Sequence, residues 1–137
     1  SYKLIHFVGH GSTQGGKAFL HLTSSDDVID LEKERKLFDN LKGRIMFFSC
    51  CYIGKQEKVM KHLCESSGAT AIFSYTKKTS DREAFLTAAI FYHIFMKESG
   101  KIRMTSEDVD AKIYQPTIEA VKKVFGYKTE DWLVMDG

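Results

Sequence analysis

A continuous apolar run, Ile45 to Phe48, constrains the fold of this chain more than any other stretch. Such a run is typical of a strand buried on both faces of a parallel sheet, although periodicity alone leaves a buried helix open. Cys50 and Cys51 follow at its carboxyl end, Gly54 allows a tight exit, and the next residues, 56–64, look helical. Reactive groups of open α/β sheets lie at strand carboxyl ends, and a nearby helix N-terminus favours a thiolate. This stretch therefore predicts a reactive thiol.

A second apolar strand is expected over residues 3–8, and it too ends in a reactive side chain, His10, between Gly9 and Gly11. The chain between His10 and Cys51 is long enough to return the second strand in parallel with the first. A thiol and an imidazole are the smallest set of side chains that nucleophilic catalysis by cysteine requires. The two strand ends therefore predict a cysteine-dependent site.

The remaining sequence predicts an alternation of helices and strands. The expected elements are a loop over 11–16, one arm of a small β excursion over 18–22, a helix over 27–38, a buried strand over 69–75, a helix over 81–97, a helix from 107 and a final strand over 132–135. Ser80 and Glu83 form a capping box at the start of the 81–97 helix, which is apolar nearly all round and is expected to pack heavily on the sheet. Pro116 either kinks its helix or begins a second one. This order predicts a layered α/β domain with a mostly parallel sheet flanked by helices.

Composition narrows the classes of function. A chain of 137 residues with 43% hydrophobic content is one domain with a substantial core. The net charge of +2 is nearly balanced, so direct binding of nucleic acid is not expected. No window of eighteen apolar residues lacks charges, which argues against a membrane span. Three cysteines, two of them adjacent, argue against a disulfide framework and lead us to expect a cytoplasmic location.

The histidine and glycine patterns argue against a zinc site and against a dinucleotide-binding loop. His6 alternates with apolar residues and is expected to be a packed or edge histidine. His21, His62 and His93 stand singly, without the spacing of a zinc site, so we expect no metal. The sixth position of the Gly-x-Gly-x-x-Gly pattern that starts at Gly9 is a glutamine, which argues against a dinucleotide loop.

The motifs at the two strand ends resemble those of CHAT-domain peptidases, a branch of the caspase-like group that includes caspases, separase and gingipains. HFVGHG (6–11) is similar to the His-Gly signature, and MFFSCCYIG (46–54) to Ser-Ala-Cys-x-Thr-Gly. GATAIFSYTKKTSDREAFLTAAIFYHIF (68–95) resembles the segment in which a strand leads through an acidic residue into an apolar helix. DWLVMDG (131–137) resembles the last strand. The four motifs occur in the family's order and cover most of the chain.

The resemblance implies a three-layer caspase-like fold and particular roles for four residues. His10 corresponds to the catalytic histidine and Cys51 to the nucleophile, because Cys51 has the family's spacing to Gly54. The backbone N–H groups of Gly11 and Cys51 correspond to the oxyanion hole. Asp81 corresponds to an acidic position close to the substrate pocket, where it would favour a basic P1 residue, although a plain helix-capping role is equally open. The resemblance leaves Cys50 on a small-residue position, where we expect a buried thiol, as we do for Cys64.

The implied activity is that of a cysteine endopeptidase that cleaves a protein substrate, needs no cofactor and is controlled by a sensor or partner domain in the same or another chain. The alternative is a catalytically silent caspase-like module that binds partners or acts in signalling. Two features depart from the family. Ile53 replaces the usual Thr or Ser, and the family's amino-terminal strands and helix do not precede residue 3. We therefore expect residues 1–137 to be a single CHAT-like domain that forms the carboxyl-terminal part of a larger protein.

Overall fold

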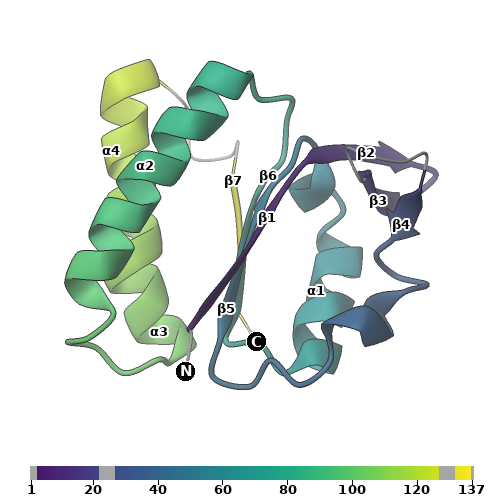
Figure 1. The fold of residues 1–137 in the computed structure, drawn as a ribbon, viewed down its shortest axis with the longest axis horizontal. Coiled ribbons are helices and arrows are strands. Elements are labelled where there is room, and N and C mark those ends of the chain that lie inside the picture. The colour runs from purple at the N-terminus through teal and green to yellow at the C-terminus, as the bar shows by residue number, and fades with distance from the viewer. Residues whose placement is uncertain (1–2, 22–26, 127–131, 137) are drawn as a thin grey trace.

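The computed structural model describes residues 3–21, 27–126 and 132–136. At its centre lies a four-stranded sheet in the order β1-β5-β6-β7. Its strands are β1 (Leu4–Val8), β5 (Ile45–Ser49), β6 (Ala71–Tyr75) and β7 (Trp132–Asp136). The first three run parallel, and β7 runs antiparallel to β6 (Figure 1). The expected α/β class and mostly parallel sheet are thus confirmed, including the strands expected at 3–8, 45–50 and 69–75.

Side chains alternate between the two faces of β5, as the period of a strand requires. Ile45 and Phe47 join one core cluster, whereas Met46 and Phe48 join another on the opposite face. All five residues of β5 are buried. This burial on both faces explains why the strand is read in the sequence as an unbroken apolar run.

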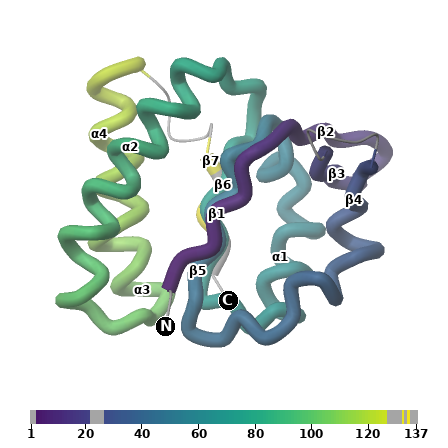
Figure 2. The backbone as a smooth tube through the Cα atoms, in the orientation of Figure 1, coloured from purple at the N-terminus to yellow at the C-terminus, as the bar shows by residue number. Residues whose placement is uncertain are grey.

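Helices cover both faces of the sheet (Figures 1 and 2). Helix α1 (Glu57–Ser67) lies on one side and ends at Gly68, whose φ of 76° is left-handed. The other side carries α2 (Asp81–Glu98), α3 (Ser106–Val109) and α4 (Gln115–Phe125). Pro116 lies in the first turn of α4, directly after a π-helical turn, so the helical run continues through it.

The expected packing of α2 on the sheet is confirmed, along one stripe of the helix. Thr87, Phe91 and Phe95 are buried against the sheet and α4. Phe85 and Met96 are 73% and 74% exposed on the outer face. A helix in an outer layer contacts the core along one stripe only, whatever residues its other face carries.

Residues 10–21 and 28–30 form a second, antiparallel sheet on the α1 side. Its strands are β2 (His10–Gln14), β3 (Lys17–His21) and β4 (Val28–Asp30), in that order. The loop expected over 11–16 is therefore wrong. Gly15 and Gly16, with φ of 58° and 78°, make a two-residue turn that suits a hairpin. The β excursion expected over 18–22 is confirmed as far as residue 21, and residue 22 lies outside the described residues.

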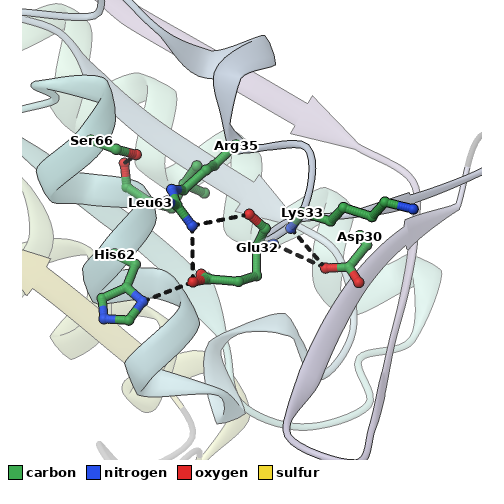
Figure 3. Close-up of polar contacts among 7 residues, drawn as sticks. All are labelled: Asp30, Glu32, Lys33, Arg35, His62, Leu63 and Ser66. Atoms are coloured by element: carbon green, nitrogen blue, oxygen red, sulfur yellow. Dashed lines mark hydrogen bonds and ion pairs between the residues drawn. The ribbon is translucent and has the colours of Figure 1, made fainter.

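The helix expected over 27–38 is also wrong. Its first residues pair with β3 as β4, and only Arg35–Phe38 forms a short 3₁₀ turn. The Asp30 carboxylate accepts the N–H groups of Glu32 and Lys33 at 3.1 and 3.2 Å, a local turn that competes with helix formation (Figure 3). Glu32 in turn lies 2.9 Å from His62 Nδ1 on α1, which connects the small sheet to the helix layer.

Within the described part of the chain, no helix combines the length and apolar content needed to cross a membrane.

Candidate active site

The carboxyl ends of β1, β5 and β6 meet at one edge of the main sheet, beside the first turns of α2 (Figure 1). A cleft of about 770 Å³ lies at this edge. His10, Cys51 and Asp81 all line it. The cleft therefore brings together the three side chains that the sequence singled out, from three separate parts of the chain.

The turn after β5 presents Cys51 at the edge of the sheet. Tyr52, the next residue, adopts a left-handed conformation with φ of 65°, which is uncommon for a residue with a side chain. The Ile53 N–H donates to the Cys51 carbonyl at 2.9 Å, and the Tyr52 N–H donates to the Lys77 carbonyl at 3.1 Å. These bonds hold the turn against the loop after β6 and leave the Cys51 side chain partly exposed.

The Cys51 sulfur contacts the backbone of Thr79. The Thr79 N–H donates to Sγ at 3.3 Å, and the Cys51 thiol donates to the Thr79 carbonyl at 3.5 Å. A thiolate at the position of this sulfur would accept a hydrogen bond from the same Thr79 N–H. Thr79 is a site residue that sequence reasoning missed, because it is 28 positions from Cys51 and its contribution comes from the backbone.

Gly11 packs directly against the turn that carries Cys51. A side chain at this position would collide with the Cys51 carbonyl oxygen and would come within 2.8 Å of Ile53 Cγ1. Ile53 is itself fully buried in the core cluster on the α1 side, so its side chain supplies an apolar anchor for the turn.

The register of the hairpin directs the Gly11 N–H away from β3. Gln14 and Lys17 flank the two-residue turn, and hydrogen-bonded and non-hydrogen-bonded pairs alternate from there. Gly11 and Leu20 consequently form a non-hydrogen-bonded pair. The Gly11 N–H therefore makes no hydrogen bond to β3. An oxyanion donor must meet this condition.

His10 is the first residue of β2 and is exposed at the cleft. Its partner in the ladder is His21, whose Nε2 lies 2.6 Å from Ser12 Oγ. Side chains of directly opposed residues share a face of the sheet, so His10 and His21 stand side by side. The short hairpin thus holds the His10 backbone firmly while its imidazole faces the cleft.

A further histidine, His6, lines the inner wall of the cleft. Its ring stacks on Phe47 with centroids 4.4 Å apart, and Nδ1 lies 2.9 Å from the Tyr92 hydroxyl. Burial lowers the pKa of His6, which keeps the ring neutral at pH 7. The expected role as a packed histidine is confirmed.

Charged groups lie only at the rim of the cleft. Asp81 and Lys78 line it, and both are exposed. Ser80 accepts the Glu83 N–H at 3.2 Å, which confirms one half of the expected capping box. Asp81 is therefore both a first-turn residue of α2 and part of the cleft, and its two expected roles are compatible.

Cys50 and Cys64 are each 1% exposed, as expected for structural thiols. The Cys50 thiol points away from the cleft into the core and lies 3.7 Å from the Phe7 carbonyl. Burial, and to a smaller extent the neighbouring Cys51, raise the pKa of Cys50 to about 12. Adjacent cysteines thus occupy different environments, with Cys50 in the core and Cys51 at the cleft.

We expect alkylation by iodoacetamide to distinguish the three thiols across pH 6 to 9. With a pKa of about 12, roughly one Cys50 thiol in ten thousand is ionised at pH 8, and burial also blocks access. Cys51 is therefore expected to react at least about 100-fold faster than Cys50 or Cys64. Peptide mapping by mass spectrometry measures each rate, with the urea-denatured chain as the control in which all three react. Equal rates in the folded chain would contradict the placement of these thiols.

No group of three or more His, Cys, Asp or Glu side chains in the described ranges is arranged to hold a metal ion. Neither the protein-family models nor the curated proteins searched contain a match to this chain.

Proposed function

We propose that this chain is a caspase-like cysteine endopeptidase of the CHAT type. The observation that carries the proposal is the position of His10 and Cys51, which line one cleft at the ends of neighbouring parallel strands. The close contact of Gly11 with the turn of Cys51 supports it, since it places the backbone of β2 directly against the backbone of that turn. The proposed chemistry therefore depends on the carboxyl ends of β1 and β5 and on the β2–β3 hairpin.

In the proposed reaction, Cys51 Sγ attacks the scissile carbonyl, the thiol proton passes to His10, and a tetrahedral intermediate forms. The N–H groups of Gly11 and Cys51 bind its oxyanion, and one such donor is worth about 2.7–4 kcal/mol of transition-state stabilisation. His10 donates a proton to the leaving amine as the C–N bond breaks and an acyl-enzyme forms. His10 then takes a proton from water, which attacks the thioester and releases the acid and the free thiol. No cofactor takes part in these steps.

Asp81 is proposed to help select the substrate. Its carboxylate lies on the rim of the cleft, where it is placed to attract a basic residue of the substrate. A sensor or partner domain is proposed to regulate access, because the loop that contacts Cys51 through Thr79 also forms part of the cleft wall. A shift of that loop would alter both the thiol and the cleft.

The alternative is a catalytically silent module that binds a protein partner. One observation favours it: Val8 and Phe85, both on the rim of the cleft, are 75% and 73% exposed. Exposed apolar side chains grouped at one place are typical of protein–protein contacts. The same residues also suit a substrate polypeptide, so the two proposals differ in the reactivity of Cys51.

A library of peptidyl acyloxymethyl ketones separates the two proposals. An endopeptidase is expected to form one covalent adduct, on Cys51, and the adduct should form far more slowly in His10→Ala. Intact-mass measurement counts the adducts, and peptide mapping identifies the thiol. A chain that forms no adduct, or reacts equally at every thiol, would instead be the silent module.

A further inference from the structure

Three hydroxyl groups gather at the inner end of the cleft, beyond Cys51. Ser49 and Tyr75 line the cleft from the ends of β5 and β6, and Thr87 lies behind them on α2. Their side chains are almost completely enclosed: Ser49 is 8% exposed, Tyr75 2% and Thr87 0%. The inner end of the cleft is therefore polar but largely closed to water.

These hydroxyls retain unused hydrogen-bonding capacity. Burial raises the pKa of Tyr75 to about 12, and the nearby Ser49 and Thr87 hydroxyls offset part of that rise. They are close enough for this influence, yet within the described residues no well-formed hydrogen bond reaches the Tyr75 hydroxyl or Thr87 Oγ1. A hydrogen bond needs both a short distance and a suitable angle, and proximity alone does not satisfy these hydroxyls. Buried polar groups without partners are uncommon in folded proteins and often mark a place where a ligand completes the network.

The wall between this polar end and the rim is apolar on the α2 side. Ala84 and Ala88, one helical turn apart on α2, line one side with methyl groups only. The ring of His6 lines the wall as well, and its Nε2 is a further buried atom without a partner. Charged side chains of the cleft lining, Lys78 and Asp81, are exposed at the rim and not at the inner end.

We propose that this inner compartment is the P1 pocket of the chain and that it selects an uncharged side chain with an apolar stem and an amide end, glutamine being the best fit. The inference rests on the proposed peptidase function and adds the substrate class. It differs from the basic P1 residue that Asp81 led us to expect from the sequence, since Asp81 meets substrate outside the compartment.

The chemistry of the compartment excludes charged ends more strongly than apolar ones. A buried ammonium, guanidinium or carboxylate needs a counterion, and the described residues at the inner end provide none. A side-chain amide is neutral and both donates and accepts, which matches hydroxyls that can do either. Leucine fits the walls but leaves the hydroxyls without partners, and a site built to hydrogen-bond a substrate discriminates against analogues that cannot.

Fluorogenic peptides that differ only at P1 test the proposal on the full chain. We expect kcat/KM for glutamine to exceed that for leucine by about tenfold and those for lysine, arginine and aspartate by about 100-fold. Tyr75→Phe, which removes one hydroxyl at nearly constant volume, should lower the glutamine-to-leucine ratio about tenfold, and Ser49→Ala should lower it too. Tyr114→Phe is the matched control, because Tyr114 is equally buried in the same core cluster but does not line the cleft.

A binding measurement keeps the proposal testable apart from catalysis. In Cys51→Ala, N-acetylglutamine N-methylamide should shift the NMR signals of Ala84 and Ala88 saturably, whereas N-acetyllysine N-methylamide, with its free amine, should not. Binding without hydrolysis of any peptide would overturn the peptidase function and leave the preference of the pocket standing. Hydrolysis that favours lysine, arginine or aspartate, or a ratio that Tyr75→Phe leaves unchanged, would overturn the pocket alone. Neither binding nor hydrolysis would overturn both.

Discussion

Cys51→Ala is expected to abolish peptide hydrolysis, and His10→Ala to lower kcat by about 10²–10⁴-fold. The first change removes the sulfur that forms the acyl-enzyme, for which the cleft lining offers no second thiol. The second removes the group that protonates the leaving amine, and general acid–base catalysis contributes a factor of that size. Both variants should keep the wild-type melting temperature within a few degrees, because His10 is exposed and Cys51 is partly exposed.

Cys50→Ala is the matched control for the nucleophile. Cys50 is adjacent in sequence but lies in the core, with its thiol toward the Phe7 carbonyl. We expect this variant to lose some stability, about 1 kcal/mol, and to retain most of its kcat. The measurement is hydrolysis of the best fluorogenic peptide, with the concentration of folded enzyme determined separately. Activity that survives in Cys51→Ala but disappears in Cys50→Ala would reverse the assignment of the two cysteines.

Gly11→Ala is expected to be the most damaging change outside the catalytic pair. The added methyl group would overlap the Cys51 carbonyl oxygen and would lie 3.1 Å from Cys50 Cβ, in addition to its contact with Ile53. Either β2 or the turn that carries Cys51 must move. A displacement of about 1 Å in a catalytic group costs about 100-fold in rate, and overpacking costs about 1–3 kcal/mol of stability. Hydrolysis assays and thermal unfolding measure the two effects.

Gly100→Ala provides the comparison for Gly11→Ala. Gly100 lies just after α2, and a side chain there would meet no atom within 4 Å. We expect wild-type rate and stability from this variant. If Gly11→Ala behaved in the same way, the close packing of β2 on the turn that carries Cys51, and with it the proposed oxyanion hole, would be incorrect.

Local patterns in the sequence predicted the central sheet and the positions of its reactive residues. The apolar runs that became β5 and β6 are recognisable because both faces of these strands are buried. Ser80 marked a helix start through a hydrogen bond that depends on a few neighbouring residues. These signals are contained within short windows, so no knowledge of packing was needed.

Where a residue's environment depended on distant parts of the chain, the same patterns failed. Residues 27–38 have helical spacing, but pairing of β4 with β3 and the turn at Asp30 override it. The apolar residues of α2 lie nearly all round the helix, yet the structure buries one stripe of them and leaves Phe85 exposed. Strand pairing and burial depend on which element lies opposite, a property that local spacing does not contain.

The candidate site divides in the same way. The sequence by itself determined that an imidazole and a thiol follow two apolar strands, because a strand end and its flanking glycines are visible in one short segment. Only the tertiary structure decided that Thr79 contacts the Cys51 sulfur and that Ser49, Tyr75 and Thr87 enclose the inner end of the cleft. Those contacts join β5, β6, α2 and the loop after β6, and they exist only once the layers have packed together.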